Sequence, residues 1–182
     1  MKNFLKLAEG VDVTPLNAAI ARQPELWNAN TLRTKHPHTA HGQVDDIWVR
    51  FNEVDPQNPL TVVDDTECIN YPAMFKLPQI RPLLFGLMKI VEGERMGRVL
   101  ITKMKPGTRI NPHVDMGAPA DYYDRYHIVL ASTPGCVFRA GEEKVWMRPG
   151  EVWWFDNKQE HEVVNNGTDD RTHIVVDIRT TR

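Results

Sequence analysis

The sequence predicts a mainly β (α+β) fold, a double-stranded β-helix of the jelly-roll or cupin-like kind with N-terminal helices packed outside it. From Arg98 onward, short apolar segments alternate with turn residues at intervals of roughly eight to twelve residues, which is typical of a sandwich or jelly roll. Both segments with a helical pattern precede these strands. We therefore expect a β core with helices on its outer surface.

The N-terminal half of the chain predicts few regular elements. Thr14 and Pro15 are typical of a helix start, and Pro24 indicates that this helix ends near Gln23. A second, largely buried helix is predicted to begin near Pro82. The expected segments are a helix at 14–22, a strand at 47–51, a turn-rich surface loop at 52–65 and a helix at 80–91.

The C-terminal half predicts a succession of short strands joined by turns. Residues 105–108 and 148–150 are turn sequences, and residues 136–147 have the pattern of a hairpin. The expected strands are 99–104, 126–130, 136–139, 144–147, 151–155, 162–164 and 172–178. We expect residues 1–182 to form one domain, with a helical and loop N-terminal part at 1–97 and the jelly-roll core at 98–179.

Composition and charge argue against several classes of protein. A hydrophobic content of 41% and a charged content of 25% are ordinary for a soluble globular protein. The net charge is −2 and the basic residues are scattered, so we expect neither a nucleic acid nor an anionic membrane partner. No stretch is apolar enough to span a membrane and no signal-peptide core follows Met1, so a cytoplasmic location is expected. For Cys68 and Cys136 we expect two free thiols, with one disulfide as the alternative.

The main functional signal is the tripeptide His113-Val114-Asp115 together with the distant His161. Two neutral imidazoles and one carboxylate are the ligand set of a facial site for non-haem Fe(II), which leaves three coordination positions open. His113 follows the turn at 105–108 and His161 opens a strand-like segment, so the two can converge from separate strands. Because an HxD tripeptide is common by chance, the inference depends on the whole set. We assign His113, Asp115 and His161 as metal ligands and catalytic residues.

Arg171 adds a cation to this set. It follows His161 by ten residues, and its fork-shaped guanidinium can bind a carboxylate through two hydrogen bonds. A cation beside such an iron site suggests an oxygenase that uses 2-oxoglutarate and O₂.

The stretch from about Val99 to Arg179 resembles the aspartyl/asparaginyl β-hydroxylase family of Fe(II)/2-oxoglutarate-dependent oxygenases. The residues that carry the resemblance are Met104–Thr108, Pro112–His113, Arg125–His127, Gly150–Asp156, His161–Val163 and Arg171–Asp177. Vertebrate members of this family replace the carboxylate of HxD with a non-ligand. Asp115 is present here, as in the related bacterial hydroxylases of free amino acids, so the set of three metal ligands is expected to be complete.

The resemblance implies a hydroxylase that uses Fe(II), 2-oxoglutarate and O₂ to hydroxylate an unactivated C–H bond of an amino acid, free or in a peptide, with release of succinate and CO₂. It implies that Arg171 and Thr102 bind the distal carboxylate of 2-oxoglutarate, and that Arg125 and His127 bind the carboxylate near the iron. Arg125 and His127 are two residues apart and therefore share one face of their strand. The alternatives are a salt bridge at the barrel end for Arg125 and a hydrogen-bonded core histidine for His127. His173 is expected to support the site structurally.

For the substrate, the sequence gives only weak indications. The polar segment with His36, His38 and His41 is expected to be a loop that can act as a lid. The residues before the β-rich region contain no repeat array that would dock a folded protein. We therefore expect a small substrate, a free amino acid or short peptide-like metabolite, enclosed by the loops His36–His41 and Asp121–Asp124. Further candidates for substrate contact are Arg50, Tyr122, Tyr123 and one of Trp153 and Trp154.

Two other functions fit parts of the pattern. A metal-dependent cupin-type enzyme that does not use 2-oxoglutarate would need the metal ligands but no pair of cations beside them. A non-catalytic jelly-roll binding module would need no complete set of ligands. Arg171 and Arg125 argue against the first alternative because two cations near a metal favour a diacid. The intact set of two histidines and Asp115 argues against the second.

Overall fold

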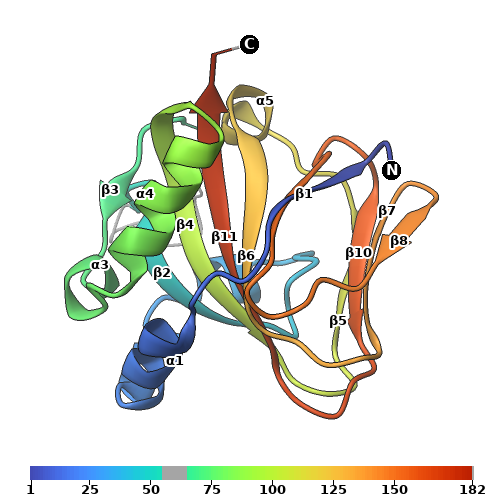
Figure 1. Ribbon diagram of the computed structural model, residues 1–182, viewed down its shortest axis with the longest axis horizontal. Coiled ribbons are helices and arrows are strands. Elements are labelled where there is room, and N and C mark those ends of the chain that lie inside the picture. Colours follow the sequence, from blue (N-terminus) through green and yellow to red (C-terminus); the bar gives the residue numbers. More distant parts are fainter. Residues whose placement is uncertain (55–64, 182) are drawn as a thin grey trace.

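Two antiparallel sheets face one another in the computed structural model of the chain, which describes residues 1–54 and 65–181 (Figure 1). The larger sheet contains, in spatial order, β1 (Phe4–Ala8), β9 (Val152–Phe155), β6 (Asp124–Ala131), β11 (Arg171–Thr180), β4 (Gly93–Met104), β2 (Asp45–Phe51) and β3 (Ile69–Asn70). The smaller sheet contains β5 (Arg109–His113), β10 (His161–Asn165), β7 (Cys136–Ala140) and β8 (Glu143–Val145). The mainly β, jelly-roll-like fold expected from the sequence is confirmed.

Helices cover the outer face of the larger sheet, on the side away from the smaller sheet (Figure 1). These helices are α1 (Thr14–Ala21), α3 (Ala73–Lys76) and α4 (Ile80–Ile90). Leu16 of α1 and Leu84 of α4 pack in one buried cluster with Ile174 and Val176 of β11. The prediction that the N-terminal helices pack outside the β core is therefore confirmed. Shorter helical turns are a 3₁₀ helix at Pro24–Leu26, α2 (Leu32–Lys35) and α5 (Ala118–Tyr122).

The inner face of the larger sheet carries polar side chains. On β11, Ile174 and Val176 point outward, so His173 and Asp177 point inward, because side chains alternate along a strand. The register pairs Thr102 of β4 with His173, and Arg125 of β6 with Asp177, which places all four on the inner face. The larger sheet is thus apolar toward the helices and partly polar toward the smaller sheet.

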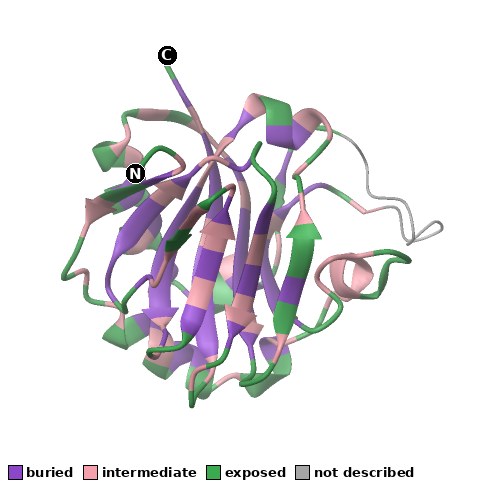
Figure 2. Cartoon of the chain, turned by 90° about the vertical axis from the view of Figure 1, so that its right-hand side faces the viewer, coloured by how far each residue is buried: buried purple, intermediate pink, exposed green. Residues whose placement is uncertain are grey.

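The smaller sheet closes over one part of this inner face. Along β7 and β10, buried residues alternate with less buried ones, as the banding in Figure 2 shows. The buried residues Phe138 and Val163 pack with Met104 and Phe155 of the larger sheet. The two sheets are therefore held together by a second apolar cluster between them.

The structure corrects several details of the sequence prediction. The strands β1 and β3 were not predicted, and β4 begins at Gly93, earlier than expected. The isolated β1 segment has no strong pattern of its own and is held by pairing with β9, where Phe4 lies opposite Phe155. The turn at 105–108 is present, and it leads from β4 in the larger sheet to β5 in the smaller one. The predicted loop at 52–65 lies mostly, at 55–64, outside the described residues.

The second predicted helix is also less buried than expected. Only one face of α4 is buried, and Phe85 on the other face is 67% exposed. Its apolar composition indicated burial, but a helix that lies on a sheet has one face in solvent.

The expected hairpin, the expected strand at 47–51 and the two expected free thiols are confirmed. The predicted hairpin is formed by β7 and β8, and β2 contains the predicted strand 47–51. Cys68 and Cys136 are both buried free thiols. No helix among the described residues is long and apolar enough to cross a membrane.

Ile174→Ala is expected to lower the free energy of unfolding by about 2–5 kcal/mol, because it leaves a cavity between the larger sheet and the helices. Ile174 is fully buried in the outer cluster. The exposed Phe85→Ala provides the matched control and should change stability by about 0.5 kcal/mol or less. Urea denaturation measures both variants. Equal losses would contradict the assignment of the core.

Candidate active site

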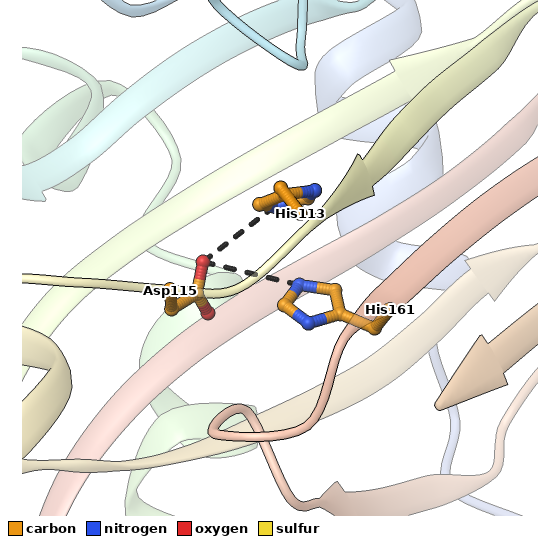
Figure 3. Close-up of side chains that lie close together, drawn as sticks. All are labelled: His113, Asp115 and His161. Carbon is orange, nitrogen blue, oxygen red and sulfur yellow. Dashed lines mark ion pairs between the residues drawn. The ribbon is translucent and has the colours of Figure 1, made fainter. Parts of the chain in front are cut away.

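His113, Asp115 and His161 lie together at one end of the smaller sheet, as Figure 3 shows. His113 ends β5 and His161 begins β10, and the register of these strands places the two residues opposite each other. Asp115 lies in the loop after β5. Its Oδ1 atom lies 3.6 Å from Nε2 of His113 and 3.9 Å from Nε2 of His161. One potential ligand atom from each residue lies within 4.8 Å of the other two, so these three residues can hold one metal ion.

Backbone carbonyl groups orient both imidazoles. Nδ1 of His113 lies 2.7 Å from the carbonyl oxygen of Asn111, and Nδ1 of His161 lies 2.9 Å from that of Gln159. A carbonyl accepts only from a protonated nitrogen, so each Nε2 atom keeps a free lone pair toward Asp115. Nε2 of His113 is buried and has no hydrogen-bond partner in the described part of the chain. A buried, unpartnered nitrogen lone pair beside a carboxylate fits a divalent metal ion.

The ionisation states at this position suit metal binding. Burial lowers the pKa of His161 to about 4, which keeps its imidazole neutral. Burial opposes ionisation of Asp115, but the Arg125 guanidinium and then the His113 contact outweigh it, so the pKa of Asp115 lies well below its usual range. At neutral pH His161 thus offers a neutral nitrogen and Asp115 an ionised carboxylate.

Arg125 connects Asp115 to the larger sheet. Its NH1 donates to Oδ2 of Asp115 at 2.5 Å, while Nε and NH2 donate to the two oxygens of Asp177 at 2.7 and 3.0 Å. The salt bridge considered as an alternative for Arg125 is therefore present. Whether Arg125 also binds 2-oxoglutarate stays a prediction.

A pocket of about 280 Å³ lies between the two sheets at this end. All seven predicted site residues line it: Thr102, His113, Asp115, Arg125, His127, His161 and Arg171. The two candidate ligand histidines come from the smaller sheet, and Arg125 and Arg171 come from β6 and β11 of the larger sheet. The pocket therefore has candidate metal ligands on one wall and cations on the other.

Arg171 is buried without a carboxylate partner among the described residues. It is 3% exposed, and its NH2 lies 3.1 Å from Nδ1 of His173. Its other contacts are the sulfur of Met104 and the ring of Phe138. Burial lowers the pKa of Arg171 to about 10. A guanidinium in such surroundings is destabilised unless an anion joins it, so the pocket is suited to an anionic ligand.

His127 of β6 and His173 of β11 lie next to each other, and His173 contacts Arg171. Their Nδ1 atoms are 3.2 Å apart, and burial, followed by the charge of Arg171, lowers the pKa of both well below the usual range. His127 lines the pocket, whereas His173 lies outside the lining and contacts Arg171. This position of His173 agrees with the structural role expected for it.

The loop containing the three N-terminal histidines lies only partly at the pocket. His36 and His41 line it, whereas His38 does not. The His41 ring lies 4.9 Å from the ring of His113, edge to face. The lid expected at 36–41 is therefore in a suitable place, and His41 contacts a candidate metal ligand.

The second predicted enclosing loop is placed wrongly by the sequence analysis. Tyr122 and Tyr123 do not line the pocket; Met116 and Ala120 do. The Tyr122 ring lies beneath two arginines, and the Tyr123 hydroxyl donates to the carbonyl of Thr66. Both tyrosines thus have structural contacts that the local sequence could not indicate.

The remaining substrate candidates also lie outside the pocket lining. Arg50 donates to the carbonyl of Met96 and to Asn70. Trp153 and Trp154 point to opposite faces of the sheet as expected, but each packs in a core cluster.

Sequence reasoning missed two cations of the pocket, Arg33 and Arg98. Arg98 lies four residues before Thr102 on β4, so strand alternation could have placed it on the same face. Arg33 lies on α2 and had no comparable signal.

The fold and site together define a jelly-roll protein with a candidate two-histidine, one-carboxylate metal centre. Residues 25–181 match the family model for aspartyl/asparaginyl beta-hydroxylase. The chain therefore belongs to the aspartyl/asparaginyl β-hydroxylase family, and the enzyme class expected from the sequence is confirmed at the level of the family.

Individual relatives are similar to the chain in part or in fold. The aspartyl/asparaginyl beta-hydroxylase of Homo sapiens is 35% identical over 88 residues, which are 47% of this chain and 11% of that protein. An oxidoreductase of the 2OG-Fe(II) oxygenase family from Burkholderia pseudomallei superposes with a TM-score of 0.59 at 17% identity, covering 98% of this chain and 84% of that one. A prolyl-4-hydroxylase from Pseudomonas putida gives 0.55 at 12% identity, covering 99% and 94%. These structural likenesses show the shared fold.

Arg171→Met is expected to raise the free energy of unfolding by about 1–3 kcal/mol at pH 7. The folded-state pKa of about 10 lies below the ordinary 12.5, so the charge on Arg171 opposes folding at every pH below about 10. Methionine removes that charge and keeps much of the volume. Urea denaturation measures the change, with the exposed Arg109→Met as a control. If Arg171→Met instead lowers the free energy of unfolding, the favourable contacts of Arg171 contribute more than the burial of its charge costs.

Proposed function

We propose that the protein is an Fe(II)- and 2-oxoglutarate-dependent hydroxylase that acts on an unactivated C–H bond of an amino acid, free or in a peptide. The observation that carries this proposal is the composition of one pocket. It contains His113, Asp115 and His161 on one side, and Arg171, buried without a carboxylate partner among the described residues, on the other. A metal ligand set beside a buried cation suits a cosubstrate that has both a chelating group and a distant carboxylate.

In this proposal His113 and His161 hold the metal through their Nε2 atoms, and Asp115 through one carboxylate oxygen. The bound iron, with O₂ and 2-oxoglutarate, supplies oxidation of a C–H bond coupled to decarboxylation to succinate and CO₂. Arg125 holds Asp115 in place and keeps it ionised. The apolar side chains around the pocket keep bulk water away from the reacting groups.

Arg171 binds the distal carboxylate of 2-oxoglutarate in this arrangement, and the Thr102 hydroxyl donates a second hydrogen bond. Thr102 is buried on β4 opposite His173 of β11, on the same sheet face as Arg171 and two residues along the register from it. Arg125 and His127 face the other end of the cosubstrate. The position of all four residues on the pocket lining supports this assignment.

The size of the pocket supports a small substrate or a single side chain. Its volume of about 280 Å³ is near the lower end of the range for small-molecule sites, roughly 300–1,000 Å³. The 2-oxo acid and the substrate must share this space with the loop that carries His41. The two alternative functions are each opposed by a different part of the pocket. A cupin-type enzyme that binds no diacid leaves Arg171 unpaired. A non-catalytic binding module does not need the three candidate metal ligands.

Anaerobic addition of Fe(II) and 2-oxoglutarate tests the proposed cofactor and cosubstrate directly. A visible metal-to-ligand charge-transfer band is expected only when the 2-oxo acid chelates the bound iron. Absence of the band from the wild-type protein would overturn the proposal.

His113→Ala and His161→Ala are each expected to abolish Fe(II)-dependent succinate formation. Each change removes one neutral nitrogen from a site with three protein ligands. His38→Ala is a matched control, because His38 lies outside the pocket lining. Wild-type succinate formation by either ligand variant would show that the metal is held elsewhere.

Arg171→Ala is expected to weaken 2-oxoglutarate binding about tenfold to a hundredfold, since a charge-assisted hydrogen bond contributes roughly 1.5–3 kcal/mol. Arg171→Lys should recover only part of this affinity, because the two-pronged geometry is lost. Titration of the charge-transfer band with 2-oxoglutarate gives the dissociation constant. An unchanged constant in Arg171→Ala would assign the distal carboxylate to another residue.

A further inference from the structure

We propose that Arg98 is a substrate-recognition residue that binds a carboxylate group of the substrate. This inference rests on the proposed function, because it takes Arg171 to be occupied by the cosubstrate. It adds a chemical class of substrate, and a residue that selects it, to the metal and 2-oxoglutarate positions described above.

The position of Arg98 suits this role. It lies on β4, two and four residues before Leu100 and Thr102, and all three side chains line the pocket. Its Nε donates to Oδ1 of Asn52 at 2.7 Å, and its guanidinium carbon lies 4.5 Å from the centre of the Phe51 ring. These contacts fix the plane of the guanidinium and occupy one nitrogen. The two terminal nitrogens form no hydrogen bond within the described part of the chain, and they match the two oxygens of a carboxylate.

Arg98 differs in its partners from Arg33 and Arg125, two of the other cations of the pocket. Arg33 donates to both oxygens of Asp46 at 2.8 Å. Arg125 is paired with Asp177 and Asp115. Within residues 1–54 and 65–181, Arg98 has no carboxylate at ion-pair distance, and the nearby Asp177 is already bound at both oxygens by Arg125. Burial lowers the pKa of Arg98, which shows that its charge is poorly solvated.

The charges of the filled pocket lead to the same conclusion. Arg33 with Asp46 and Arg125 with Asp177 form two neutral pairs. A divalent metal with Asp115 leaves one positive charge, and Arg171 and Arg98 add one each. The two carboxylates of 2-oxoglutarate balance two of these three charges. One positive charge remains, and Arg98 has no carboxylate partner among the described residues, so a substrate with one carboxylate at this position completes the balance.

A carboxylate in this pocket can come from two chemical sources. One is the α-carboxylate of a free amino acid or of a peptide C-terminus, and the other is an acidic side chain. The contact with Arg98 is the same in both cases, so the experiment must distinguish them.

Binding without O₂ is the direct test, because it does not depend on turnover. The protein is loaded with Mn(II) and 2-oxoglutarate, and calorimetry measures binding of the free amino acids. Each compound that binds is compared with its α-carboxamide. Aspartate is compared with asparagine and glutamate with glutamine, and N-acetylated, C-amidated aspartate and glutamate are included. The variants are Arg98→Gln and Arg98→Met, and Arg50→Gln is the matched control on the neighbouring strand outside the pocket.

A carboxylate-bearing compound is expected to bind the wild-type protein about tenfold to a hundredfold more tightly than the matching amide. Weaker binding of the α-carboxamide than of its parent acid identifies the α-carboxylate as the source, and weaker binding of asparagine or glutamine than of aspartate or glutamate identifies the side-chain carboxylate. Both Arg98 variants should reduce the carboxylate-to-amide ratio to near one and leave the 2-oxoglutarate charge-transfer band unchanged. Arg50→Gln should keep the wild-type ratio.

Three outcomes would overturn the role of Arg98. They are equal binding of acids and amides by the wild-type protein, binding of no carboxylate-bearing compound, and an unchanged ratio in both Arg98 variants. Each of these can occur while the charge-transfer band forms normally, in which case the proposed function stands. Absence of the band from the wild-type protein refutes the proposed function itself and the subsite with it.

Discussion

The candidate site depends on one chain of ion pairs, Asp177–Arg125–Asp115. Asp177 and Arg125 face each other on paired strands of the larger sheet, whereas Asp115 lies in a loop that follows a strand of the smaller sheet. One guanidinium therefore ties the loop to the sheet. Removal of one partner from a buried ion pair costs about 3–5 kcal/mol, because it leaves an uncompensated charge. The loop holds an ionised carboxylate beside two imidazoles because the opposite sheet provides the counter-charge.

The two sheets provide different functional groups to the pocket that lies between them. The smaller sheet positions His113 and His161 by direct pairing of β5 with β10. The larger sheet provides Thr102, Arg98 and Arg171, whose neighbours on the outer face are held by the helix-covered core. Groups that bind a metal and groups that bind anions thus lie on rigid elements that face each other. A ligand that chelates a metal and also carries a carboxylate is complementary to both walls.

The sequence by itself determined much of the fold and the local part of the site. Alternation along the strands gave β2, β6, β7 and β11, and the same periodicity put Arg125 and His127 on one face. The HxD spacing brought His113 and Asp115 together because two residues span only a short distance. These features are local, so a window of a few residues contains the information for them.

The tertiary structure alone decided the neighbours of each strand. β1 forms because β9 offers it an edge, and Tyr122 and Tyr123 turn away from the pocket because arginines and Thr66 engage them. Arg33 and His41 reach the pocket from elements far from the metal motif in sequence. Periodicity gives the face on which a side chain lies, but it does not say which strand or loop packs opposite. The pairing of Asp177 with Arg125, and the absence of such a partner for Arg98 among the described residues, follow only from the folded arrangement.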